Sequence, residues 1–461
     1  MKTPRRIVPY LSENDLHDTQ DGTVMPLEEN DLKRFHNMLR GDNPLDDPEH
    51  NALYVPRMQD RPSDDPIVDI HWQIDWAVSN GVALLTGFRG NGKSTELHRL
   101  KSMLERDGCH VILLDMDKYV NMAVPVDITD LLLALLTALA EALKEQSGLD
   151  GITQTAWEKV AAFLNREVEF HGFKLKTDLV AGSAEFGLRL KQEPSVKKLI
   201  QERLEHRVAD VFGQMDGFIS RAVAELRRQK GDPDLKVVIL VDSLEHLRGG
   251  PGQEVAMHDA VLRVFTLHAD RLRFSAAHMV YTVPPILALR ASSADRAGDS
   301  PIAMLPNIHV RVPSGDPDPN GLARMREIIS RRFADWEAAI EPDQLDALAM
   351  ASGGDFREFF RLLQSVLRRL AVRGKELGSP IKADATIIGP VIQQYGARLA
   401  LTVTQELRKR MRVIQEKKQL DAKNREDFES LMDLLDGNLV MNYQNGKTWF
   451  DVHPLLTGGD R

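Results

Sequence analysis

The sequence predicts an α/β fold in which helices cover both faces of a parallel sheet, as a three-layer sandwich. Two observations support this fold class. Between residues 82 and 312, short apolar runs alternate with longer segments whose apolar residues recur at helical spacing. The first run breaks into a glycine-rich loop that leads directly into a helix. Continuous apolar strands are typical of parallel sheets that are buried on both faces.

Five strands are predicted. The first begins at residue 82, and the others span residues 110–117, 236–241, 278–283 and 307–312. Strand, loop-helix and second strand form a βαβ unit, which requires a parallel pair. A further helical pattern over residues 67–79 leads into the first strand.

The glycine-rich loop after the first strand fits the P-loop pattern through Gly87, Gly92, Lys93 and Ser94. In this pattern backbone N–H groups surround phosphates, the lysine reaches the β/γ oxygens and the hydroxyl binds Mg²⁺. The helix that follows would present its N-terminus to the anion, and Lys93 is expected near the surface of the empty site. The alternative is an incidental glycine-rich turn. The predicted phosphate-binding residues are Gly87, Arg89, Gly90, Asn91, Gly92, Lys93, Ser94 and Thr95.

Length and composition limit the possible classes of protein. The 461 residues suggest two to four domains, and the formal net charge of −9 does not indicate a nucleic-acid coat. Cys109 is the only cysteine, which fits a reducing cytoplasm and excludes a cysteine-built zinc site. The most apolar stretch, residues 131–140, is about half the length that spans a bilayer, so we expect a buried helix and no membrane partner.

The pattern changes divide the chain into four predicted parts. Residues 1–66 form an N-terminal extension, and residues 67–315 form the α/β core, with a helical insertion at about 127–230. Residues 316–380 form a helical lid. Within the insertion, residues 170–191 predict a small hairpin, and Pro194 opens one long helix. Residues 381–461 combine helices with an Asn445-Gly446 hairpin signal, which suggests a winged helix.

Two acidic residues follow the strand at 236–241. Nucleotide hydrolysis needs one carboxylate to hold Mg²⁺ and another to orient and polarise water, and we assign these roles to Asp242 and Glu245. The alternative is that these residues only cap the next helix. Ser94 and Asp242 are therefore the predicted Mg²⁺ ligands.

Four segments together resemble the AAA+ superfamily. They are the loop from Gly87 to Ser94, VVILVDSLEHL with Asp242 and Glu245, MVYTVPP at 279–285 and GGDFREFFRLL at 353–363. Within that superfamily they are similar to STAND ATPases and archaeal origin-recognition ATPases, which add a helical lid and a winged helix. The resemblance implies ATP and Mg²⁺ as cofactors, with the catalytic set Lys93, Glu245, Thr282 and Arg357.

In that resemblance Thr282 is the polar sensor of the γ-phosphate or water, and Arg357 is the lid arginine that closes on nucleotide. A buried strand threonine and a solvated helix arginine are the respective alternatives. No clear arginine-finger motif is visible, although Arg271, Arg273 and Arg290 fall in the corresponding part of the fold. No effector domain or sensor repeat is evident either, so a partner protein would supply effector or sensor.

The resemblance thus predicts an ATP/ADP-controlled switch that forms a homo-oligomer, with a link to bacterial conflict or antiviral defence systems by association only. One alternative is a DNA-binding initiator or loader that uses the basic stretch 408–412 of the winged helix, although the many acidic neighbours favour a solvated helix there. Another alternative is a small-molecule phosphotransferase, for which no acceptor-pocket motif is visible.

Overall fold

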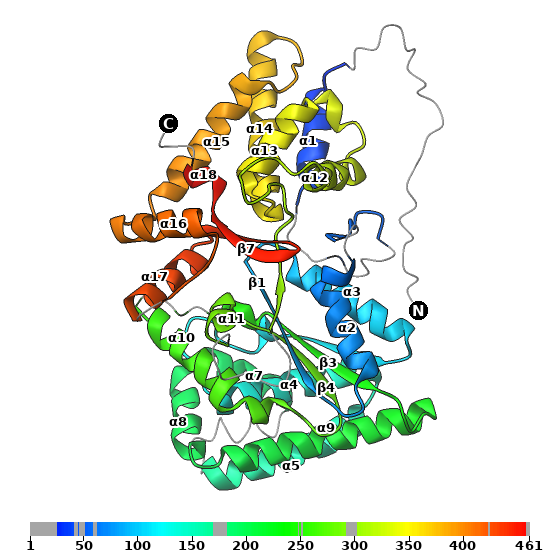
Figure 1. Ribbon diagram of the computed structural model, residues 1–461. Helices are drawn as coiled ribbons and strands as arrows, with labels where there is room; N and C mark the ends of the chain where they lie inside the picture. The colour runs from blue at the N-terminus through cyan, green and yellow to red at the C-terminus, as the bar shows by residue number, and fades with distance from the viewer. Residues whose placement is uncertain are drawn as a thin grey trace.

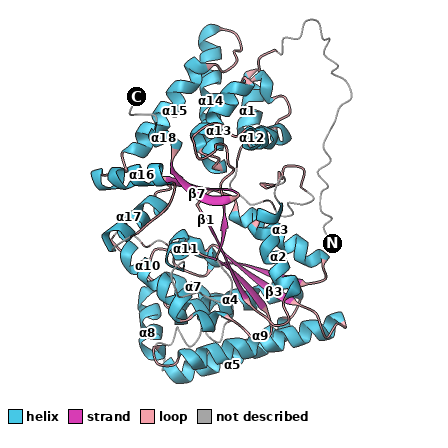
Figure 2. Ribbon diagram, in the orientation of Figure 1, coloured by secondary structure: helices cyan, strands magenta, loops and turns pink. Residues whose placement is uncertain are grey.

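The computed structural model describes residues 25–40, 45, 51–58, 62–168, 182–247, 249, 252–291, 302–422 and 425–457. At its centre lies a five-stranded sheet with the order β2-β3-β4-β1-β5, and every pairing in it is parallel. Figures 1 and 2 show this sheet between helices on both faces. The predicted α/β fold class is confirmed. The strands are β1 (Val82–Gly87), β2 (His110–Asp115), β3 (Val237–Asp242), β4 (His278–Thr282) and β5 (Ala303–Leu305).

The fifth strand was predicted wrongly. Strand β5 ends at Leu305 and pairs with Leu85 to Gly87 of β1, whereas residues 307–312 contain only one isolated bridge, Arg311 to Pro317. Their apolar pattern has another cause, because Ile308 and Val310 are buried in the core of the lid. The apolar residues Ile308, Val310 and Val312 alternate with polar ones, so the segment resembles a strand in sequence although it packs on the lid.

Helices α2 (Pro66–Trp76) and α3 (Lys93–Arg106) cover one face of the sheet, where a separate apolar cluster holds them against β1, β3 and β4. The other face carries the inserted helices, which form the lower layer in Figure 1. They are α4 (Ile128–Ser147), α5 (Asp150–Val168), α7 (Ser183–Gln192), α8 (Pro194–Leu204) and α9 (Val208–Lys230).

Helix α4 is buried along the whole stretch from Leu131 to Ala140, as predicted. Two other predictions for the insertion are wrong. Phe186 and Leu190, which were placed in a hairpin, lie on the buried side of helix α7, and residues 169–181 fall outside the described residues. The helix that opens at Pro194 also ends at Leu204, and α9 begins at Val208.

After the sheet the chain forms three lid helices, α12 (Pro319–Arg332), α13 (Pro342–Ser352) and α14 (Phe356–Leu377). The N-terminal helix α1 (Glu29–Met38) packs on α14. Its Phe35 is fully buried and stacks on Phe333 with ring centroids 4.5 Å apart. The N-terminal segment is therefore part of the lid core.

Helices α10 (Glu254–Leu262) and α11 (Pro285–Ala291) belong to the α/β core.

The C-terminal part consists of helices and a hairpin, and the predicted turn is confirmed, because Gly446 lies between the two strands with a φ of 100°. The hairpin lies between the lid and the sheet in Figure 1. Its name as a winged helix stays a prediction, as do the domain boundaries. The elements are α15 (Ala385–Ala400), α16 (Gln405–Lys417), α17 (Arg425–Asp436), β6 (Val440–Asn445), β7 (Lys447–Val452) and α18 (Pro454–Thr457).

Among the helices that the structure describes, none has the length and apolar character needed to cross a membrane.

Candidate functional site

The glycine-rich loop connects the end of β1 to the start of α3 at the carboxyl edge of the sheet, where ligands bind in open α/β folds. Gly90 and Gly92 have φ values of 92° and 81°, a left-handed region that other residues rarely adopt. Gly92 is also the N-cap residue of α3. The loop therefore presents backbone N–H groups at a helix N-terminus, which is an anion-binding arrangement.

Lys93 lies beneath this loop and is only 4% exposed, so the prediction of a lysine near the surface is wrong. Its ammonium donates hydrogen bonds to the carbonyl oxygens of Gly87 and Phe88, both at 3.0 Å. The same Nζ lies 3.2 Å from Glu245 Oε1. The structure thus brings together two of the predicted catalytic residues as a buried ion pair.

Asp242 and Glu245 lie next to each other at the end of β3, and both are buried. Burial, together with the charge of Glu245, raises the pKa of Asp242 to about 6, although the Ser94 hydroxyl and the Ser243 N–H oppose the shift. Burial alone would raise the pKa of Glu245, but Lys93, His246 and Thr282 hold this pKa below its ordinary value. The pKa values of the two neighbouring carboxyl groups are therefore shifted in opposite directions, upward for Asp242 and downward for Glu245.

Thr282, at the end of the neighbouring strand β4, is fully buried beside Glu245. Its hydroxyl oxygen accepts a hydrogen bond from the N–H of Leu244 at 3.2 Å. His246 lies 2.9 Å from an Asp117 oxygen, and this contact raises the pKa of His246 despite partial burial. Sequence reasoning missed His246, whose partner Asp117 lies two residues after the end of β2.

The predicted loop residues do not all face the same way. Asn91 is fully buried and donates from Nδ2 to the carbonyl oxygen of Leu305 at 2.8 Å. Asn442 of β6 donates to the same oxygen at 3.2 Å, so the loop and the C-terminal hairpin share one acceptor. The Thr95 hydroxyl accepts from the N–H of Leu45 at 3.4 Å. Asn91 and Thr95 therefore shape the loop in this structure.

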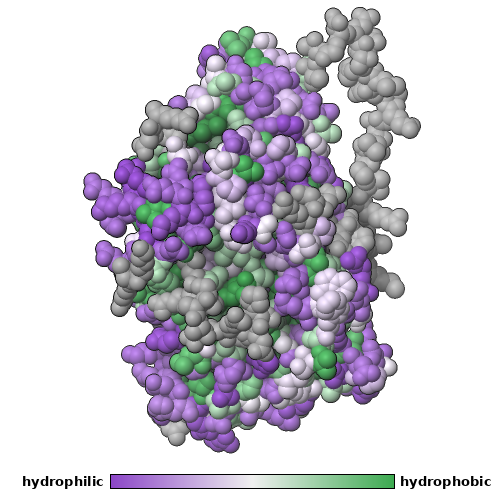
Figure 3. Space-filling view, viewed as in Figure 1, coloured by the Kyte–Doolittle hydropathy of each residue, from purple (hydrophilic) through white to green (hydrophobic). Residues whose placement is uncertain are grey.

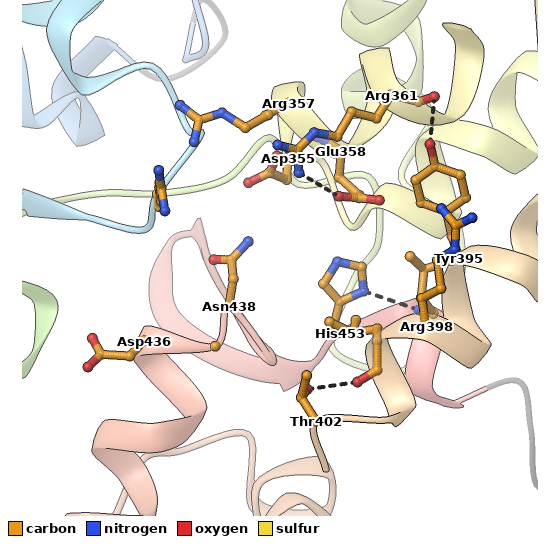
Figure 4. Close-up of a pocket in the computed structure, with 14 residues that line it drawn as sticks. Asp355, Arg357, Glu358, Arg361, Tyr395, Arg398, Thr402, Asp436, Asn438 and His453 are labelled. Atoms are coloured by element: carbon orange, nitrogen blue, oxygen red, sulfur yellow. Dashed lines mark hydrogen bonds and ion pairs between the residues drawn. The ribbon is translucent and has the colours of Figure 1, made fainter. Parts of the chain in front are cut away.

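A cavity of about 440 Å³ lies beside the loop and is lined mainly by the lid and the C-terminal segments. Figure 4 shows Arg357 pointing from the start of α14 toward the loop, with Asn438 and His453 on the opposite wall. Arg89 lines the cavity from the loop side. Arg357 and Arg89 therefore line the same cavity. The C-terminal residues were not predicted, because their contribution depends on packing between distant parts of the chain.

The donor set fits a hard cation. The hydroxyl of Ser94 hydrogen-bonds the carboxylate of Asp242, and oxygen ligands of this kind suit Mg²⁺. In the part of the chain that the structure describes, no group of three His, Cys, Asp or Glu side chains could hold a metal ion. Mg²⁺ at Ser94 and Asp242 would therefore complete its coordination with water and phosphate oxygens.

The arginine-finger candidates lie elsewhere in the fold. Arg271 is 3.3 Å from an Asp270 oxygen and lies over the ring of Phe212. Arg273 also has a partner, and the side chain of Arg290 falls outside the described residues. None of the three is assigned to the site.

The loop after β1, the lysine beneath it and the acidic end of β3 define an α/β protein with the P-loop NTPase fold, whose motifs resemble those of the AAA+ superfamily. No protein-family model matches the sequence, and no curated protein matches it.

Similar solved structures include a Walker-type ATPase of Pyrococcus abyssi, with 12% identity and a TM-score of 0.41 over 91% of this chain and 98% of that one. The ORC2 protein of Aeropyrum pernix, in ADPNP–ADP complexes, has 11% identity and a TM-score of 0.41 over 91% and 95%. Cdc6p from Pyrobaculum aerophilum has 14% identity and a TM-score of 0.34 over 92% and 95%.

Proposed function

We propose that this protein binds and hydrolyses ATP with Mg²⁺ and uses the nucleotide as a switch of assembly or partner contacts. One observation carries the proposal. Lys93 lies between the loop carbonyls and Glu245, at the sheet edge where Asp242 meets Ser94. A buried lysine, a buried base and a metal-binding pair at a loop of backbone N–H groups suit phosphoryl chemistry.

Each residue of the site has a distinct role in this proposal. Loop N–H groups and Lys93 bind the β- and γ-phosphates, and Lys93 exchanges its bond with Glu245 for phosphate oxygens. Glu245 then accepts a proton from the water whose oxygen attacks the γ-phosphorus while the bond to the β–γ bridging oxygen breaks. Thr282 lies beside this carboxylate and helps to keep it ionised. Ser94 and Asp242 would hold Mg²⁺, which neutralises charge on the phosphates when bound.

The cavity supports the switch part of the proposal, because its walls come from the loop, the lid and the C-terminal segments together. A γ-phosphate that meets Arg357 would favour one arrangement of these parts. Moving such an equilibrium from mostly open to mostly closed requires a preference of ~10⁴-fold, or ~5.5 kcal/mol. Two or three charge-assisted hydrogen bonds are of that order. ADP lacks the γ-phosphate and should not produce the change.

The test is light scattering of the Glu245→Gln variant with ATP, with ADP and without nucleotide. We expect a larger mass or a changed radius with ATP alone, which would support a homo-oligomer. The same mass and radius in all three states would disprove the switch and leave ATP binding and hydrolysis to be measured separately. A partner protein as effector or sensor, and a setting in conflict or defence, stay predictions of the resemblance.

The charges of the C-terminal helices weigh against the DNA-binding alternative. In a winged helix the helix before the hairpin enters the major groove, and here α17 carries five acidic residues and one arginine. On α16, Arg410 lies 3.2 Å from Asp427 and Lys409 lies 3.0 Å from Glu406, so part of the basic stretch is neutralised. Figure 3 shows the face over α16 as hydrophilic. Salt-dependent binding to duplex DNA that an Arg408→Glu, Arg412→Glu variant loses would reverse this ranking.

A further inference from the structure

A second cation lies against the phosphate loop, and the sequence motifs give no indication of it. Arg57 belongs to the short N-terminal segment 51–58 and is only 5% exposed. A β-carbon added to Gly92 would lie 2.8 Å from its Nη2 atom. The guanidinium therefore touches the loop at the residue immediately before Lys93.

The other two nitrogens of this guanidinium hold it in place. Its Nε donates to Glu96 Oε1 at 3.2 Å, and its Nη1 donates to the carbonyl oxygen of Pro306 at 3.1 Å. The group also lies over the ring of Phe356, 4.5 Å from the ring centroid. Arg57 thus contacts the helix that follows the loop, the end of the sheet and the first turn of α14. A planar fork fixed on two sides keeps its third nitrogen directed at one place.

The lid covers the same loop with a second arginine. A β-carbon on Gly90 would lie 3.0 Å from the Cβ of Arg357, and one on Gly92 would lie 3.9 Å from the ring of Phe356. Phe356 precedes Arg357 in the chain, so the first turn of α14 lies over Gly90 and Gly92 together. Arg57 therefore contacts the loop at Gly92, and the lid helix brings Arg357 to the same loop at Gly90.

Burial of Arg57 is costly unless the site uses its charge. Glu96 does not depend on Arg57 alone, because Tyr54 donates to both of its oxygens at 3.2 Å and Arg99 lies 3.2 Å away. Arg99 is itself paired with Asp65 at 2.6 Å. The Glu96 carboxylate would therefore keep Tyr54 and Arg99 as partners without Arg57, so Arg57 is not needed to satisfy that carboxylate.

We propose that Arg57 is a nucleotide-binding residue that contacts a phosphate of a nucleoside di- or triphosphate through Nη2, at the Gly92 end of the loop. This inference rests on the proposed function, because it assigns a further group to the same site. It also makes the N-terminal segment part of the site, since Arg57 is the residue through which that segment reaches Gly92.

The experiment compares Arg57→Gln, Arg57→Lys and the matched control Arg99→Gln by calorimetry with Mg·ATP and Mg·ADP. We expect Arg57→Gln to weaken both nucleotides by ~10-fold or more, the usual value of a hydrogen bond to a charged group. Arg57→Lys should recover part of the affinity, because it keeps the charge and loses the fork. Arg99→Gln disturbs the same Glu96 cluster without touching the loop and should bind within about 2-fold of the parent protein.

Thermal unfolding without nucleotide separates binding from anchoring. If Arg57→Gln melts earlier but binds both nucleotides as tightly as the parent protein, Arg57 is only an anchor and the inference is wrong. Should Arg57→Gln fail to fold, an Arg57→Lys variant with parental affinity overturns the inference in the same way, because a lysine cannot reproduce the fixed fork. A parent protein that binds no nucleotide would instead overturn the proposed function.

Discussion

Two acidic pairs in this chain, one fully buried and one with only Asp130 buried, are alike in sequence and different in use. Asp127 and Asp130 are three residues apart, as are Asp242 and Glu245. Each pair has a lysine 3.2 Å from one carboxylate, Lys197 at Asp130 and Lys93 at Glu245. In each pair one buried oxygen, Asp130 Oδ1 or Glu245 Oε2, has no hydrogen-bond partner.

The difference lies in what surrounds the pairs. Asp127 and Asp130 form a capping box at the start of α4, and Lys197 also donates to the carbonyl oxygen of Pro125. The side chains of Asp127, Asp130 and Lys197 therefore stabilise the start of α4 and the segment before it. Glu245 is instead paired with a lysine whose other partners are carbonyls of the phosphate loop. The role of a carboxylate pair therefore depends on the groups that it contacts. The spacing of the two acidic residues in the sequence does not determine that role.

The largest expected effect separates the two lysines. Lys93→Ala should reduce ATP affinity by ~10²-fold or more, because a desolvated charge pair is worth about 2–5 kcal/mol. Lys197→Met should leave ATP affinity unchanged and lower thermal stability. Calorimetry and thermal melts of both variants test this, and parental ATP binding by Lys93→Ala would refute the assigned site.

Because Lys93 is buried against Glu245, the Lys93→Ala variant should also lose stability, by about 3–5 kcal/mol if Glu245 stays charged and unpaired. Adding Glu245→Gln to Lys93→Ala should restore much of that loss without restoring ATP binding. Urea unfolding of the single and double variants measures the difference. If the double variant is no more stable than Lys93→Ala, the ion pair does not contribute as the structure implies.

The second effect distinguishes the carboxylate of Glu245 from that of Asp130. Glu245→Gln should keep ATP bound and slow hydrolysis by ~10²-fold or more, which is the usual contribution of a general base. Asp130→Asn is the matched control and should hydrolyse at the parental rate. Phosphate release under saturating Mg·ATP is the measurement. Equal rates in Glu245→Gln and the parent protein would leave Glu245 as a helix-end residue.

The third effect concerns the metal. Asp242 must be ionised to bind Mg²⁺, and its pKa is raised to about 6. We therefore expect the apparent Mg²⁺ affinity to fall as the pH drops below about 6, by up to ~10-fold for each pH unit. Asp242→Asn should lower the apparent Mg²⁺ affinity at every pH and remove its dependence on pH. A Mg²⁺ titration of ATPase activity between pH 5 and 8 would show whether the trend is present in the parent protein.

The smallest effect belongs to the capping pair. Burial, and then the charge of Asp127, raises the pKa of Asp130 to about 7, above its value in the unfolded chain. The folded state therefore binds this proton more tightly, so stability should fall as the pH rises from about 4 to about 7. Asp130→Asn should flatten that part of the stability profile. Melting temperatures across this range provide the test, and an equally steep profile in the variant would contradict it.

The sequence predicted what local patterns determine. The phosphate loop, four of the five strands and the Asn445-Gly446 turn each depend on a short stretch of chain. The fifth strand failed because burial of Ile308 and Val310 against the lid imitates strand periodicity. The buried state of Lys93 and the place of Arg57 could not be predicted, because both depend on contacts between segments far apart in sequence.

The carbonyl oxygen of Leu305, shared by Asn91 and Asn442, has a consequence for how the molecule unfolds. Backbone atoms near it are also satisfied by the hairpin, since Asn307 N–H donates to the Asn442 carbonyl and the Tyr443 hydroxyl donates to that of Gly353. Loss of the hairpin would expose or orphan these groups at the back of the loop. The hairpin from β6 to β7 should therefore stabilise the back of the nucleotide site, and truncation before β6 would not yield a minimal ATPase.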